Sequence, residues 1–91
     1  MMDKYAWQAA AYYSAKRIIA RKYRTKPFLA EELLSDVVKD IGECFDYRVW
    51  GGVVRSISSD GYIKINSFGR AKTSRGSYKP KWVKCPNWGK K

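Results

Sequence analysis

The stretch DYRVWGGVVRSISSDG, residues 46–61, decides the fold of this 91-residue chain, because it predicts a helix over residues 47–59. Asp46 is a residue type that caps helix N-termini, and Gly61 ends the helix because glycine adopts the positive φ that other residues resist. Apolar residues at helical spacing predict a core-facing stripe of Val49, Trp50, Val53, Val54 and Ile57. The opposite face is predicted to carry Arg48, Gly51, Gly52 and Arg55.

Two more helices are predicted upstream. Residues 3–23 are alanine-rich, with Asp3 as N-cap and Pro27 beyond the end. One face of this helix is predicted to be apolar, with Trp7, Ala11, Ala15 and Ile18. Another face is predicted to be basic, with Arg17, Arg21 and Arg24. Residues 29–40 predict the second helix, closed by Gly42. Its solvent face is predicted to be acidic, with Glu32, Asp36, Asp40 and Glu43.

The rest of the chain changes to the period of a strand. Residues 62–66 alternate between apolar and polar, and residues 81–85 predict a returning strand that Pro80 and Pro86 bound as a short edge strand. Residues 67–79 predict a basic loop between them. The expected fold is therefore α+β, a winged helix-turn-helix of three helices followed by a two-stranded β-hairpin. We expect one domain over residues 1–86 and a flexible basic tail over residues 87–91.

Charge indicates the class of partner. The chain has 19 Lys and Arg against 8 Asp and Glu, a net charge of +11, and residues 61–91 contain no acid. A field of this strength attracts polyanions. Charge alone does not choose among DNA, RNA and an anionic membrane.

Composition disfavours several other classes. No apolar run approaches the roughly 20 residues of a membrane span, so we expect no membrane association and no targeting segment. Cys44 and Cys85 are expected to be reduced thiols in a cytoplasmic protein, with a disulfide between them as the alternative. The chain has no histidine and no glycine-rich phosphate loop, so we expect no metal, no cofactor and no catalytic activity.

The order of helices predicts a DNA-binding protein. When two helices are joined by a short glycine-containing turn, the second one typically enters the major groove of duplex DNA. The predicted contacts of this helix are Tyr47, Arg48, Gly51, Gly52 and Arg55. Two adjacent glycines inside a helix indicate either close approach of DNA or tight packing on another helix, and both interpretations stay open. The arginines either contact guanine edges and phosphates or are merely solvated.

The basic loop is the second predicted DNA contact. Its cations and hydroxyls suit a phosphate backbone or a minor groove, and the residues are Arg70, Lys72, Thr73, Ser74, Arg75 and Lys79. The alternative is a basic loop with no dedicated ligand. Backbone contacts from Arg17, Arg21 and Arg24 are an additional hypothesis, beside the alternative of a solvated face.

Two other functions are compatible with the sequence beside duplex DNA binding. The acidic face of the second helix could dock a protein partner, as in a small inhibitor of a host nucleic-acid machine. Exposed aromatic rings could stack on unpaired bases, although Trp7, Trp50 and Trp82 fall on predicted core faces. The rings expected to be exposed near the basic elements are Tyr47, Phe68 and Tyr78. The sequence leaves monomer and homodimer open.

Residues 46–55, followed by Gly61-Tyr62-Ile63, resemble small winged-helix proteins of bacteriophages and prophages. Those proteins often carry an Asp-x-Arg-x-aromatic-Gly motif at the recognition helix and a Pro-Phe segment before the preceding helix, as in Pro27-Phe28 here. Thr73-Ser74-Arg75-Gly76 and Trp82 match the family's wing loosely. The chain departs from the family in having no His beside Ser-Arg and Leu29 in place of a Ser or Thr cap. The resemblance covers residues 5–84 and implies a winged-helix fold, DNA binding and a place in the cytoplasm of a bacterium or an infected host cell.

Overall fold

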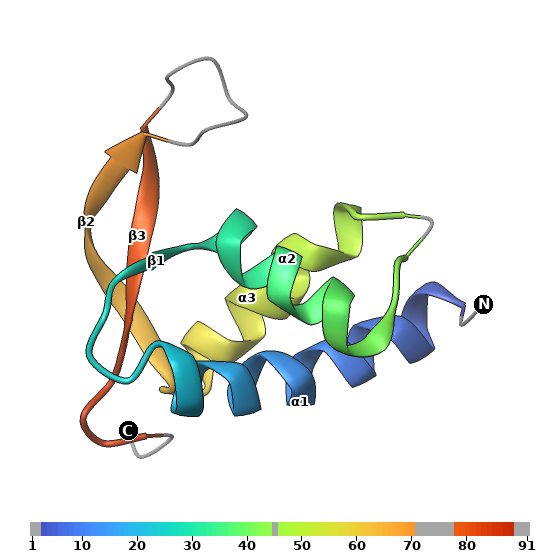
Figure 1. The fold of residues 1–91 in the computed structure, drawn as a ribbon, viewed down its shortest axis with the longest axis horizontal. Helices are drawn as coiled ribbons and strands as arrows, with labels where there is room; N and C mark the ends of the chain where they lie inside the picture. Colours follow the sequence, from blue (N-terminus) through green and yellow to red (C-terminus); the bar gives the residue numbers. More distant parts are fainter. Residues whose placement is uncertain (1–2, 45, 71–77, 89–91) are drawn as a thin grey trace.

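The first helix of the chain packs against both of the other helices. The computed structural model describes residues 3–44, 46–70 and 78–88, and within these it holds three helices and a three-stranded antiparallel sheet (Figure 1). The elements are α1 (Lys4–Lys22), β1 (Phe28–Leu29), α2 (Ala30–Ile41), α3 (Arg48–Ser59), β2 (Ile63–Arg70) and β3 (Tyr78–Lys84). Figure 1 shows α1 lying along both α2 and α3, while β2 and β3 stand at one end of the helices.

Local chemistry explains where the helices begin and end. The Asp3 carboxylate accepts hydrogen bonds from the first backbone N–H groups of α1, at 2.9 Å from the N–H of Tyr5 and from that of Ala6. Both predicted glycine stops have positive φ, 92° at Gly42 after α2 and 89° at Gly61 after α3. α3 begins one residue later than predicted, at Arg48.

Two tryptophans hold α2 in the core by both ends. Trp7 of α1 donates from Nε1 to the Gly42 carbonyl oxygen at 2.9 Å, and Trp50 of α3 donates to the Ala30 carbonyl oxygen at 3.2 Å. Both indoles are buried, as predicted, and their ring centroids lie 6.3 Å apart. Each therefore satisfies its polar N–H while it supplies apolar area to the core. The position of α3 relative to α2 follows from these contacts.

The sheet has three strands where the sequence predicted two. Its order is β1-β3-β2, with Phe28 opposite Trp82 and Leu29 opposite Lys81. Leu29 therefore belongs to a strand, and its prediction as the first helical residue is wrong. β3 is the central strand rather than an edge strand. Pro80 lies inside β3 but beyond the reach of β1, where the strand has one described neighbour and a missing N–H is tolerated.

The hairpin strands are longer than predicted. β2 continues to Arg70 and β3 begins at Tyr78, so Arg70 and Lys79 lie in strands and not in a loop. The predicted contacts Lys72, Thr73, Ser74 and Arg75 lie outside the described residues. The predicted tail also begins too early, because Trp88 packs on Tyr62 with ring centroids 4.7 Å apart.

Candidate nucleic-acid interface

Three of the four residues predicted on the outer face of α3 are exposed. Arg48, Gly51 and Arg55 are exposed, and we call these three residues the outer strip. Gly52 is different, because a Cβ there would lie 2.9 Å from Nε2 of Gln8 on α1, whereas a Cβ on Gly51 would meet nothing within 4 Å. Gly52 therefore faces a neighbouring helix, which favours the packing interpretation at this position over the predicted DNA contact. Gly51 leaves the backbone open to a ligand.

A groove separates the outer strip from the hairpin. It has a volume of about 460 Å³ and is lined by Gly51, Val54 and Arg55 of α3 on one side and by Pro80 and Trp82 of β3 on the other. Two of the three residues of the outer strip thus border the hairpin directly. The third, Arg48, lies one turn earlier on the same helix.

The two faces of the hairpin differ in chemistry. Ile65 pairs with Trp82 and Phe68 with Pro80, so these four share the face toward α3. Ile65 is 50% exposed and Phe68 62% exposed, so this apolar face extends past the helices. Alternation places lysines on the other face, and we call Lys64, Lys79 and Lys81 the hairpin lysines. A β-bulge between Ile65 and Ser67 adds one residue to β2. Because of this extra residue, Phe68 lies on the same face of the hairpin as Ile65.

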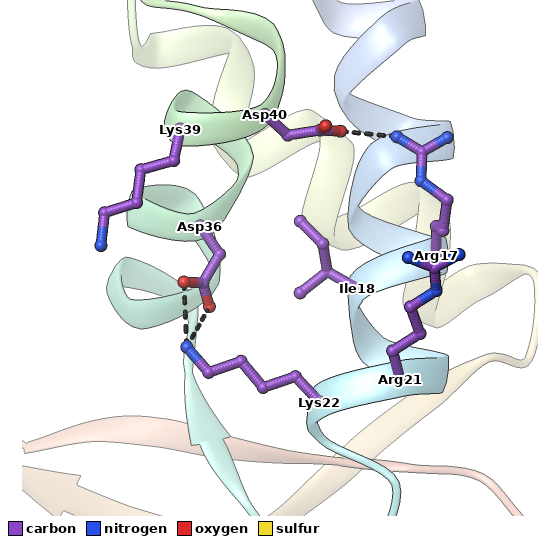
Figure 2. A pocket seen from close by; sticks show the side chains of 7 residues that line it. All are labelled: Arg17, Ile18, Arg21, Lys22, Asp36, Lys39 and Asp40. Carbon is purple, nitrogen blue, oxygen red and sulfur yellow. Dashed lines mark hydrogen bonds and ion pairs between the residues drawn. The ribbon is translucent and has the colours of Figure 1, made fainter.

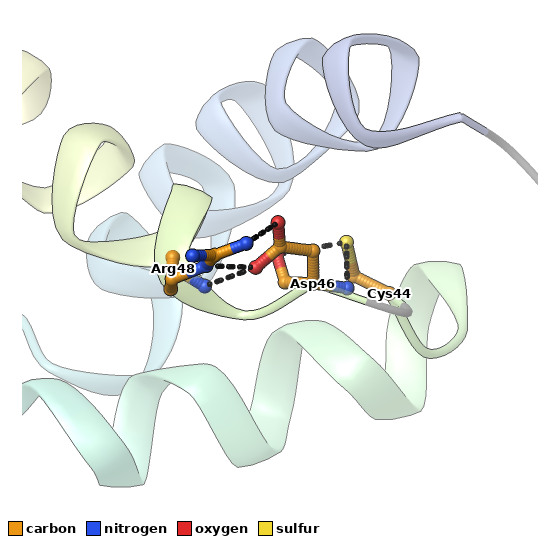
Figure 3. A network of polar contacts seen from close by, with 3 residues as sticks. All are labelled: Cys44, Asp46 and Arg48. Carbon is orange, nitrogen blue, oxygen red and sulfur yellow. Dashed lines mark hydrogen bonds and ion pairs between the residues drawn. The ribbon is translucent and has the colours of Figure 1, made fainter.

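The first residue of α3 is held by the residue before the helix cap. Arg48 donates from Nε to Asp46 Oδ1 at 2.9 Å and from Nη2 to Asp46 Oδ2 at 3.0 Å (Figure 3). The same carboxylate accepts the backbone N–H of Arg48 at 3.2 Å. The side-chain and backbone hydrogen bonds from Arg48 hold the pKa of Asp46 below its usual range, and the pair raises the pKa of Arg48. The sequence indicated Asp46 only as a cap and missed this pairing, although an Asp two residues before an Arg at a helix start is a readable signal.

A charged seam joins α1 to α2. Arg17 pairs with Asp40 at 2.5 Å and Lys22 with Asp36 at 3.0 Å, on either side of Ile18 (Figure 2). We call these four charged residues the charged seam. Two acids of the predicted acidic face, Asp36 and Asp40, thus pair with cations of α1, and a third, Glu32, accepts the Leu29 N–H at 2.9 Å. Docking of a protein partner on this face stays a prediction. The predicted contact Arg17 pairs with Asp40, and its side chain remains 53% exposed.

The acids of the charged seam are stabilised in their ionised form. Hydrogen bonds from Ser14, at 2.6 Å, and from Arg17 lower the pKa of Asp40. Burial alone would raise the pKa of Asp36, but hydrogen bonds from Tyr23 and Lys22 outweigh it and the pKa is lowered. Burial and the bond to Asp36 together raise the pKa of Tyr23.

Ion pairs are distributed unevenly over the structure. Those between residues whose side chains the structure describes lie in the charged seam and at the start of α3, and none of these involves the hairpin. Arg21 and Arg24, the two other cations predicted as backbone contacts, are exposed and form no ion pair within residues 3–44, 46–70 and 78–88. The hairpin lysines and Arg55 are therefore cations without an acidic partner in this part of the chain.

Two of the three rings that the sequence predicted to be exposed near the basic elements are exposed. Tyr47, at 42%, and Phe68 are exposed, while Trp82 is partly buried against the core. The side chain of Tyr78 lies outside the described part. The structure also contains a cation–π contact that the sequence did not indicate. Nζ of Lys16 lies 4.1 Å from the ring centroid of Tyr62, just before β2.

Comparison with known protein families, curated proteins and solved structures found no match to this chain. The described helices include none that is both long and apolar enough to cross a bilayer.

Proposed function

We propose that this protein is a winged helix-turn-helix module that binds double-stranded DNA, with α3 in the major groove and the hairpin on the backbone or minor groove. The order of elements supports this assignment, since α3 follows α2 after a connection over residues 42–47 that begins with Gly42, and the antiparallel hairpin follows α3. In this fold β1 is a third strand that extends the hairpin into a small sheet.

The observation that carries the proposal is the placement of unpaired cations. The outer strip lies across one groove from the hairpin, and neither Arg55 nor the hairpin lysines have an acidic partner among the described residues. Phosphate contacts of this kind supply most of the sequence-independent affinity for DNA, while a helix in the major groove reads the bases. A binding role without catalysis is consistent with this surface.

The apolar wall of the groove gives the surface a second property. Val54, Pro80 and Trp82 line it, and Ile65 and Phe68 continue the same face of the hairpin. Apolar side chains that line the major groove can contact thymine methyl groups. A purely cationic surface does not offer this contact. The resemblance to phage proteins supports a role as a regulator or replication accessory factor of a phage or mobile element.

The test measures duplex affinity against salt for a matched pair of variants. Arg55→Ala removes a cation from the groove, and Lys39→Ala removes one from α2, where Figure 2 shows Lys39 pointing away from α1. We expect Arg55→Ala to weaken binding about tenfold and Lys39→Ala to weaken it less than about twofold. Equal effects of the two substitutions would contradict the assignment of the surface.

The competitor in this test decides which nucleic acid is bound. Duplex DNA should compete with the labelled duplex much better than a single strand of the same length. Preference for the single strand would instead favour stacking of unpaired bases on exposed rings such as Tyr47 and Phe68.

A further inference from the structure

The pairing of Arg48 with Asp46 leaves one edge of the guanidinium free. Nε and one N–H of Nη2 donate to the carboxylate, so the Nη1 N–H groups and the second N–H of Nη2 remain available. These form the end-on edge of the guanidinium, with two roughly parallel donors. The Arg48 side chain is 90% exposed, so this free edge faces solvent rather than the protein.

The holding carboxylate is itself well fixed. The Asp46 side chain is only 16% exposed, and the Asp46 backbone N–H lies 3.4 Å from the Cys44 sulfur (Figure 3). An arginine at a helix N-terminus also meets the positive end of the helix dipole, and a carboxylate beside it compensates for that repulsion. Asp46 therefore fixes the direction of a side chain that would otherwise sample many rotamers.

We infer that Asp46 is a positioning residue that directs the free edge of Arg48 to the O6 and N7 atoms of a guanine, an inference that rests on the proposed binding of duplex DNA. Guanine presents these two acceptors in the major groove, and a bidentate arginine matches them. Base contacts come from the N-terminal part of a recognition helix, which is where Arg48 lies.

The negative charge of Asp46 contributes in a second way. A carboxylate bonded to Arg48 cancels much of the attraction of the guanidinium for any phosphate, and it opposes phosphate directly. The pair therefore lowers general affinity for DNA while it favours one base. An unpaired arginine at the same position would bind duplexes of any sequence more evenly.

The experiment uses duplexes selected by the protein from a random pool, with each guanine of the consensus replaced in turn by 7-deazaguanine, which lacks the N7 acceptor. The variants are Arg48→Ala, Asp46→Asn and the control Asp3→Asn. Asn at position 46 still accepts from the Arg48 backbone but presents an amide N–H where Oδ2 accepted from Nη2. Asp3→Asn removes the same charge and keeps a good N-cap.

In the parent protein and in Asp3→Asn, we expect 7-deazaguanine at one position to weaken binding about tenfold. In Asp46→Asn and Arg48→Ala, the same replacement should weaken binding less than about threefold. Asp46→Asn should bind random duplex at least as tightly as the parent, an outcome that a folding defect would not produce. Equal sensitivity of Asp46→Asn and Asp3→Asn to the replacement would overturn the positioning role.

A second result would overturn the guanine contact itself. If no guanine position is sensitive to N7 removal in a parent protein that binds duplex DNA, the free edge of Arg48 binds something other than the guanine N7. A parent protein that binds no duplex contradicts the proposed function instead, so the two failures are distinguishable.

Discussion

The charged seam between α1 and α2 and the groove between α3 and the hairpin both carry cations, but they use them in opposite ways. In the seam, Arg17 and Lys22 face carboxylates and are held in place by them. Along the groove and hairpin, Arg55 and the hairpin lysines meet no described acid. The net charge of +11 therefore says less about where a polyanion binds than the positions of the 8 acids do.

Substitution of the hairpin lysines is the strongest test of this difference between the seam and the groove. Substituting Lys64, Lys79 and Lys81 together by Ala should weaken duplex binding about a hundredfold at physiological salt, because each lost phosphate contact removes close to one unit of salt dependence. The measurement is the dissociation constant over a series of salt concentrations.

A double substitution of cations on the helices is the control. Arg21→Ala with Lys39→Ala removes cations that line the hollow beside the seam. It should change the affinity less than about threefold and leave the salt slope unchanged. If it reduces the slope as strongly as the hairpin substitutions do, the helices also contact the backbone and the contrast between the two regions fails.

The acids of the seam allow a second prediction, which concerns stability. The pKa of Asp36 is lowered in the folded protein, so its stabilising contribution is present above the unfolded pKa and is lost as the pH falls through the folded pKa. The thermal midpoint of the parent should therefore fall on acidification below the ordinary carboxylate value of 3.8. Asp36→Asn should unfold at a lower temperature than the parent near neutral pH. Its thermal midpoint should also fall less on acidification.

The two curves should converge at low pH, where the carboxylate of the parent is protonated. Parallel curves would mean that Asp36 contributes no ionised-state stability. Duplex affinity should stay close to that of the parent, because the seam lies away from the groove.

Local sequence patterns predicted the helices because their determinants are local. Asp3, Gly42 and Gly61 act within one turn of the helix that each bounds, and the apolar stripes identify the buried faces. β1 was missed because a two-residue strand is stabilised by Trp82 and Lys81, which are far away in sequence. No pattern around Phe28 and Leu29 indicates those partners.

The candidate site was predicted less completely for a related reason. A helical wheel places Gly51 and Gly52 on one outward face, but only the packing of α1 shows that Gln8 lies against Gly52. In the same way, the acidic face of α2 was predicted to be solvated because it lies away from the apolar stripe. Its spacing complements the cations of α1, and that complementarity becomes visible only when the two helices are placed side by side.

The adjacent glycines of α3 give the smallest but most local prediction. Gly51→Ala should raise the free energy of unfolding by about 0.5–1 kcal/mol, since alanine is the better helix former and a Cβ at this position meets open space. Gly52→Ala should gain less, because the new Cβ must displace the end of the Gln8 side chain. Chemical denaturation of the two variants measures the difference.

Duplex affinity should separate the same two variants in the opposite direction. If DNA approaches the backbone at the outer strip, the methyl group of Gly51→Ala obstructs it and weakens binding, while Gly52→Ala, directed at α1, leaves binding intact. A Gly51→Ala variant that is more stable and binds as tightly as the parent would mean that the outer strip is not approached closely. The glycine at position 51 would then have no role that this surface explains, whereas the role of Gly52 in packing α3 on α1 would stand.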